Sequence, residues 1–188
     1  MFGRMRAASP DLNMDAAVSV SHPMTVNRVT VESDFWTAVD DLKSDADDQG
    51  AGGMDEREFG SGVYYTYVEI AGDALKKNLG GDAGEAVAAI GGLIEAMATT
   101  TPGGHRTSFN NNVRASYLRV EIGQPTGNLM MAAFETPVVG TMPAIEALRR
   151  AADLEGKAYG LKAQIHELSV PEGMGTLADV RAGVVKAV

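Results

Sequence analysis

The residues that could carry out chemistry are few and stand far apart in the chain. The three histidines, His22, His105 and His166, show neither His-Glu-x-x-His nor His-x-His spacing, so their pattern does not indicate a metal site. The absence of cysteine excludes thiolate metal sites, cysteine nucleophiles and disulfides. Ser61 lies between two glycines but lacks the Gly-x-Ser-x-Gly elbow that exposes a nucleophilic serine. We therefore expect no enzyme and no bound cofactor.

Two of the histidines and one glycine-rich stretch have simpler structural interpretations. His22 lies on the apolar side of an alternating segment, which predicts a packed histidine, and His166 beside Glu167 is expected at the surface. Residues 80–84 (Gly-Gly-Asp-Ala-Gly) could hold a phosphate on free N–H groups at a helix start. Because Asp82 would place an anion at that position, a helix capped by its own side chain is favoured.

Two segments carry residue types that suit contact with nucleic acid. Phe35 and Trp36 lie in an acidic stretch, where exposed aromatic rings could stack on bases or wedge between them. The alternative is that they anchor this stretch to a sheet. Residues 101–112 form a loop rich in Gly and Asn that contains His105 and Arg106 and no acid. It offers amides, hydroxyls and a guanidinium to a sugar–phosphate backbone, although an ordinary polar loop has the same composition.

The charge of the chain is unevenly distributed. The 188 residues carry a formal net charge of −9 and are 45% hydrophobic, which suits one domain with a buried core. Residues 32–58 contain ten acids and two bases, a local balance of −8, whereas residues 96–120 contain no acid. The acidic total therefore does not exclude RNA as a partner. We find no apolar run long enough to span a bilayer and no signal peptide, so we expect a cytoplasmic protein without a membrane partner.

Hydrophobic periodicity predicts three strands and three helices. Residues 18–26 alternate and form a strand that should lie at an edge or bulge at Pro23, while residues 63–70 are apolar on both faces and predict a central strand. A third strand is expected over 113–122. The helices are expected from Asp82 to the stop at Pro102, over 143–159, and after Thr176. Gly91 in the first helix suggests close packing against a sheet.

This order predicts an α+β fold that resembles a ferredoxin-like, or RRM-like, sheet without its first β-α pair. We expect a single partial domain over residues 1–188. Residues 1–31 and 61–188 would form the RRM-like palm and the appended C-terminal helices. Residues 32–60 are too long for a hairpin turn and too acidic for a core, so they are expected to project as an insertion.

Several strings resemble the type I-E CRISPR Cascade backbone subunit, the CasC family. The most specific are Phe-Trp-Thr-Ala-Val-Asp-Asp-Leu at 35–42 and Glu-Phe-Gly-Ser-Gly-Val-Tyr-Tyr-Thr-Tyr at 58–67. Asn-Leu-Gly-Gly at 78–81, Phe-Gly-Arg-Met at 2–5 and the segment 15–22 agree in order and spacing. Family members are about twice as long, so the resemblance implies that this chain corresponds to their C-terminal half.

The resemblance implies a non-catalytic subunit that binds CRISPR RNA. Copies of it would assemble along the guide with other Cascade subunits, and target DNA would be reached through the guide. Residues 32–60 would be the thumb. Met5 and Trp36 match positions that pack against nucleotides at a kink, with Phe35 supporting the wedge, as suits a subunit that must accept any guide sequence. We add Arg4, His105 and Arg106 as expected contacts to the RNA backbone.

Two other functions remain open at this stage. The chain could be a truncated remnant that no longer assembles, because the segment missing relative to the family carries the fingers and many of the basic residues. It could also be a small ferredoxin-like ligand-binding domain, although the sequence shows no site for a substrate.

Overall fold

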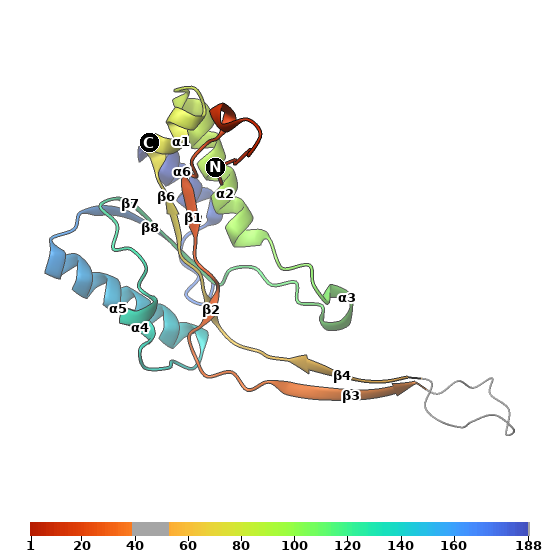
Figure 1. The fold of residues 1–188 in the computed structure, drawn as a ribbon. Helices are drawn as coiled ribbons and strands as arrows, with labels where there is room; N and C mark the ends of the chain where they lie inside the picture. Colours follow the sequence, from red (N-terminus) through yellow and green to blue (C-terminus); the bar gives the residue numbers. More distant parts are fainter. Residues whose placement is uncertain (39–52, 188) are drawn as a thin grey trace, which may run out of the picture.

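The computed structural model describes residues 1–38 and 53–187 (Figure 1). In chain order the strands are β1 (Val18–Val20), β2 (Met24–Thr25), β3 (Glu32–Ala38), β4 (Gly53–Phe59), β5 (Tyr64–Tyr65), β6 (Val68–Ile70), β7 (Tyr117–Gly123) and β8 (Ala163–Ser169). The helices are α1 (Gly72–Asn78), α2 (Ala83–Thr99), α3 (Arg106–Phe109), α4 (Met130–Phe134), α5 (Thr141–Tyr159) and α6 (Leu177–Ala187), preceded by the 3-10 turn η1 (Pro10–Leu12). This mixture of helices and strands confirms the α+β class.

The first two predicted strands pair with each other but are each broken in the middle. β1 pairs with β6 and β2 pairs with β5, both antiparallel. The break lies at His22-Pro23, where proline has no N–H to donate, as the sequence indicated. Ser21 bridges the break, since its N–H donates to the Tyr67 carbonyl at 2.9 Å. The prediction of a central strand over 63–70 was wrong, because within the described residues β5 and β6 each pair on one side only.

The third predicted strand exists as β7 and has a partner that the sequence pattern did not reveal. β8 pairs with it antiparallel, with Leu118 opposite Leu168 and Val120 opposite His166. Polar residues in 163–169 obscure the alternation there. Between β7 and β8 the chain forms α4 and α5, and α5 confirms the helix expected over 143–159.

Two helices cover one face of the β7–β8 ladder. α2 packs against α6, and α6 packs against β8 and β7. The shared core consists of Ala17, Leu75, Ala86, Ile90, Ile94, Ala98, Leu118, Val180 and Val184. The capping prediction is confirmed, since the Asp82 carboxylate accepts the N–H of Glu85 at 3.0 Å. Gly91 faces the side chain of Arg181 on α6, and an added Cβ would lie 3.7 Å from it, an ordinary contact, so the prediction of close packing against a sheet was wrong.

The placement of two histidines corrects the sequence-based expectations. His22 is exposed, because the chain turns out of the ladder between β1 and β2. His166 is half-buried, not at the surface, and its ring lies against Gly183 on α6. A side chain at position 183 would collide with this ring, so the glycine makes room for the histidine.

A second, smaller core fixes α4 and α5 beside the β2–β5 ladder. It contains Val26, Leu129, Phe134, Ala144, Leu148 and Ala152. The rings of Tyr65 and Phe134 lie 5.7 Å apart, and the Tyr65 hydroxyl accepts the N–H of Leu129 at 3.3 Å.

None of the described helices has the length and apolar character needed to cross a membrane.

β3 and β4 form a two-stranded arm that extends away from the other elements (Figure 1). Glu32 lies opposite Phe59 at the base of the arm, and Ala38 lies opposite Gly53. Side chains along both strands are almost all exposed, so the arm contributes little to either core. The middle of the expected insertion, residues 39–52, lies outside the described residues.

Candidate nucleic-acid interface

Arg4 and Met5 lie in an N-terminal loop that is closed by backbone hydrogen bonds. The N–H groups of Arg4 and Met14 each donate to the other residue's carbonyl at 2.8 Å. The Arg4 Nε–H also donates to the Leu12 carbonyl at 2.9 Å, so this side chain follows the loop. The Met5 side chain stands free, with 88% of its surface exposed. An apolar side chain held so far into solvent has no role in the core of the described structure.

Phe35 and Trp36 lie on β3, and their side chains point to opposite faces of the arm. Successive residues of a strand alternate between its faces. Trp36 lies opposite Asp55 on one face, whereas Phe35 lies opposite Glu56 on the other. Their exposed fractions are 37% for Trp36 and 63% for Phe35. The structure therefore keeps both rings accessible but does not unite them in one wedge.

His105 and Arg106 begin the short helix α3 in the loop that lacks acids. His105 has a left-handed backbone with φ 52°, as does Asn110 at the other end of the helix with φ 46°. The Arg106 guanidinium donates to the Asn112 side-chain oxygen at 3.0 Å, which holds the loop in place. Both side chains are exposed. An arginine has five N–H donors, so this internal hydrogen bond leaves others for a phosphate.

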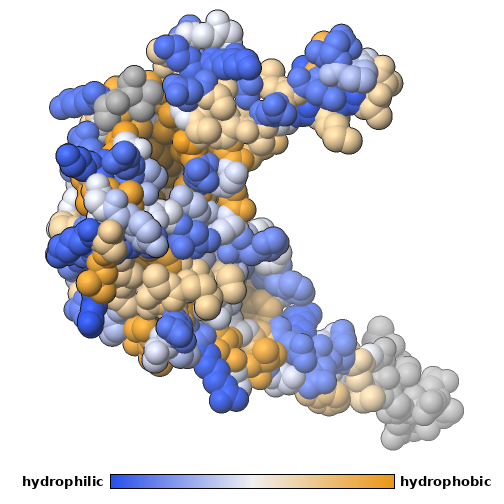
Figure 2. All heavy atoms as spheres, turned by 60° about the vertical axis from the view of Figure 1, so that its left-hand side comes forward, coloured by the Kyte–Doolittle hydropathy of each residue, from blue (hydrophilic) through white to orange (hydrophobic). Residues whose placement is uncertain are grey.

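The structure brings α3 and the arm together but leaves the N-terminal loop apart. The Arg57 Nη1–H on β4 donates to the Ser108 hydroxyl at 3.5 Å, and the rings of Phe59 and Phe109 lie 5.7 Å apart. Figure 1 shows the N-terminal loop beside α2 at one end of the molecule and the arm at the other. In Figure 2 the surface is hollowed between two projections, and the lower projection is the arm that leads to the grey residues 39–52.

Sequence reasoning missed the side chains that join the arm to α3. Arg57 is the one base near the end of an acidic run, and Phe59 directly precedes Gly60. The guanidinium of Arg57 lies over the Trp36 ring, 5.7 Å from its centroid. An isolated base within an acidic strand was the available signal, but its two partners are 21 and 51 positions away in the sequence.

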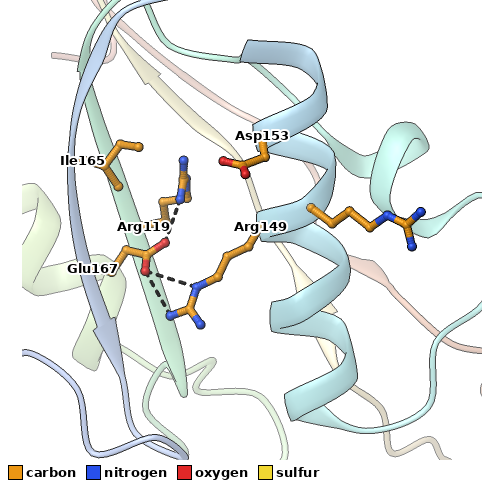
Figure 3. A pocket seen from close by; sticks show the side chains of 6 residues that line it. Arg119, Arg149, Asp153, Ile165 and Glu167 are labelled. Atoms are coloured by element: carbon orange, nitrogen blue, oxygen red, sulfur yellow. Dashed lines mark hydrogen bonds and ion pairs between the residues drawn. The ribbon is translucent and has the colours of Figure 1, made fainter. Parts of the chain in front are cut away.

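A chain of ion pairs in the body of the molecule was also missed. Arg119 lies between Glu121, at 2.6 Å, and Glu167, at 2.7 Å. Arg149 on α5 lies between Glu167, at 2.9 Å, and Glu172, at 2.8 Å (Figure 3). Arg119 and Glu121 are two positions apart on β7 and so share a face, but β8 had to be known before Glu167 could be assigned as their neighbour.

These ion pairs change the pKa values of the groups that form them. Burial raises the pKa of the Tyr117 hydroxyl to about 12, and its hydrogen bond to Glu167 adds to this increase. Burial also acts to raise the pKa of Glu167, but hydrogen bonds from Tyr117, Arg149 and Arg119 outweigh it and lower the pKa. Glu121 has a lowered pKa because the bonds from Thr126 and Arg119 likewise outweigh burial.

The ion pairs fasten α5 to the β7–β8 ladder across a cavity of about 380 Å³. Arg119, Arg149, Arg150, Asp153, Ile165 and Glu167 line this cavity (Figure 3). The guanidinium of Arg149 also lies over the Tyr117 ring, at 5.3 Å from its centroid. Because the arginines at its centre are neutralised by carboxylates of the same chain, we assign a structural role to this cluster.

Among the described residues no group of His, Asp and Glu side chains is arranged to hold a metal ion.

Comparison with known proteins identifies the family. The search of curated proteins found no match. Two solved chains, each 28% identical to this one, match over its full length. The first, from a CRISPR RNA-guided surveillance complex, has a TM-score of 0.84, and this chain covers 76% of it. The second, from a pre-nicking CRISPR RNA-guided surveillance complex, has a TM-score of 0.86, and this chain covers 55% of it. The family described as CT1975-like protein matches residues 1–186. The chain therefore belongs to the CT1975-like family of Cas proteins.

Proposed function

We propose that this chain is a non-catalytic backbone subunit of a type I-E Cascade complex, of the CasC kind, that binds CRISPR RNA in the cytoplasm. Repeated copies would assemble along the guide with the other subunits, and the guide would recognise target DNA. The observation that carries the proposal is the match of the whole chain to chains of RNA-guided surveillance complexes.

The exposed apolar side chains support contact with RNA that does not depend on base sequence. Met5 is 88% exposed on the N-terminal loop, and the Trp36 indole is accessible on the arm. A methionine and an aromatic ring can separate or stack on bases without reading their edges. This property suits a subunit that must accept every guide. The hollow between the two projections in Figure 2 would then receive the RNA.

Polar residues in the N-terminal loop and at the start of α3 support contacts to the RNA backbone. Arg4 and Arg106 each use one internal acceptor, which fixes the direction of the side chain and leaves further N–H groups free for phosphates. Together with His105 they lie in segments that contain few acids. We propose that these three side chains hold the sugar–phosphate backbone, while Met5 and Trp36 contact bases.

We also propose that the body is an RRM-like palm without its first β-α pair. The β1–β6 and β7–β8 ladders share one helical core, with Ile70 and Val120 both packed against it, yet among the described strands β6 and β7 do not pair. An additional strand between β6 and β7 would join the ladders into one sheet.

A second candidate is that this chain does not hold RNA by itself. The chain spans little more than half the length of one of the solved chains that it matches. If the part that it does not span is indispensable for holding RNA, this chain would fold and still bind no guide.

Co-expression with the other complex subunits and a guide distinguishes the two candidates. We expect guide RNA to co-purify with the affinity-tagged chain, and the double variant Met5→Ala, Trp36→Ala to retain less of it. A chain that is folded by circular dichroism and brings down no RNA in any such mixture would overturn the proposed function and favour the second candidate.

A further inference from the structure

We propose that α3 sets the direction of the β3–β4 arm and, through Arg57, the orientation of the Trp36 indole. Arg57 is in this view a positioning residue, and Ser108 and Phe109 form the platform on which it rests. The consequence for RNA rests on the proposed function. The contact between the arm and α3 can be tested without RNA.

The arm needs such a support because its own strands cannot fix it. A two-stranded hairpin is at best marginally stable in water unless one of its faces packs against another element. Apart from half-buried Gly53, every described side chain of β3 and β4 is exposed. The direction of the arm must therefore come from contacts at one face near its base.

One face of the arm carries all of the side chains that make these contacts. The pairing register places Trp36, Arg57 and Phe59 on the same face of the arm. Their cross-strand pairs alternate along the arm with pairs whose side chains point to the other face. Phe35 and Met54 lie on the opposite face and are 63% and 65% exposed. Among the described residues, the contacts that support the arm thus lie on its Trp36 side.

Two contacts join this face to α3. The Arg57 guanidinium donates to the Ser108 hydroxyl at 3.5 Å. The Phe59 and Phe109 rings lie 5.7 Å apart with 39° between their planes, a tilted geometry that aromatic pairs favour. One contact is polar and the other apolar, and they involve alternate residues of β4. Together they restrict both the tilt and the twist of the arm.

Arg57 transmits this support to Trp36. Its guanidinium lies 5.7 Å from the centroid of the indole, within the range of a cation–π interaction. The far edge of the same ring lies over Gly53, where an added Cβ would be 3.9 Å from the ring atoms. The indole is therefore held between the backbone of β4 and a guanidinium that is itself bound to α3.

Side chains within the α3 loop also connect the platform to the rest of that loop. The Asn112 side-chain oxygen accepts hydrogen bonds from Thr101 at 3.3 Å and from Arg106 at 3.0 Å. The centroids of the His105 and Phe109 rings lie 6.0 Å apart. His105 is the residue with left-handed backbone that precedes α3. The loop residues that we assign to the RNA backbone are thus also those that hold Phe109 in place.

Trp36 is the single tryptophan of the chain, so its fluorescence reports directly on this arrangement. We expect Phe109→Ala, which removes a ring that does not belong to the arm, to raise the acrylamide quenching constant of Trp36 about twofold and to lower its anisotropy. Met54→Ala, on the opposite face of the same arm, is the matched control and should change neither. Equal quenching in Phe109→Ala, Met54→Ala and the unaltered chain would overturn the proposal.

Further variants separate positioning from general loss of structure. Ser108→Ala removes one exposed hydroxyl, so it tests the platform even if Phe109→Ala unfolds. Arg57→Met should raise quenching as Phe109→Ala does, and Arg57→Lys should restore part of the protection, since it retains a cation near the ring. Lack of any rescue by lysine, or no effect of Ser108→Ala and Arg57→Met, would contradict the assignment. Because no RNA is present, these results stand whether or not the chain retains a guide.

Discussion

Phe35 and Trp36 are neighbours in the sequence, but their side chains lie on opposite faces of the β3–β4 arm. Trp36 shares its face with Arg57, which lies over the indole, whereas Phe35 faces away from α3. The sequence suggested that Phe35 supports Trp36 in one wedge. The alternation of the strand prevents this, so each ring must act on its own.

Trp36→Ala should weaken guide binding more than Phe35→Ala. Loss of one aromatic stacking partner costs about 1 to 3 kcal/mol of binding free energy. The Trp36 indole is oriented by Arg57, whereas Phe35 is 63% exposed on the face away from α3. Fluorescence anisotropy titration of a labelled guide into the assembled complex measures the difference. Equal losses from the two substitutions would show that the orientation of the ring does not matter.

Met5→Ala should impair retention of the guide without changing folding. Because the Met5 side chain is 88% exposed, its truncation should change the free energy of unfolding by no more than about 0.5 kcal/mol. Urea denaturation measures stability, and the ratio of co-purified RNA to protein measures retention. Met131→Ala on α4, at a site that is 74% exposed, is the matched control and should affect neither. A large loss of stability in Met5→Ala would place this residue in a core.

Glu167→Gln should destabilise the fold, because this carboxylate joins two arginines and a tyrosine. The amide keeps the shape of the side chain but removes the charge that pairs with Arg119 and Arg149. Leaving such partly buried groups without a charged partner costs about 1 to 3 kcal/mol. Urea denaturation should show a smaller loss for Glu172→Gln, because among the described residues Glu172 forms one ion pair, with Arg149. Similar losses from both substitutions would contradict a central role for Glu167.

Stability should fall at acidic pH because the folded state holds the pKa values of Glu121 and Glu167 below 4.5. A carboxyl group whose pKa is lowered by folding contributes stability above its unfolded pKa. That contribution is lost as the pH falls through the folded value. We expect the urea midpoint to fall as the pH drops below about 4.5. Glu167→Gln should make the decline shallower, and an unchanged decline would show that other groups cause it.

Much of the secondary structure could be predicted because its signals are local. The cap of α2 depends on Asp82 and a backbone N–H three residues later, and the break in the first strand depends on Pro23. β8 could not be found in this way. Its half-buried polar residues His166 and Glu167 are accommodated by β7, by α6 and by Arg149 on α5. Their burial depends on partners that are distant in sequence.

The sequence by itself determined the α+β class, the main helices and the acidic character of residues 32–58. It also identified Phe35 and Trp36 as exposed candidates for stacking on bases. Only the tertiary structure decided that Arg57 lies over the indole and that α3 meets the arm at Ser108 and Phe109. The physical reason is that periodicity and capping act over a few residues, whereas these contacts join positions 21 to 51 residues apart, and only chain folding brings them together.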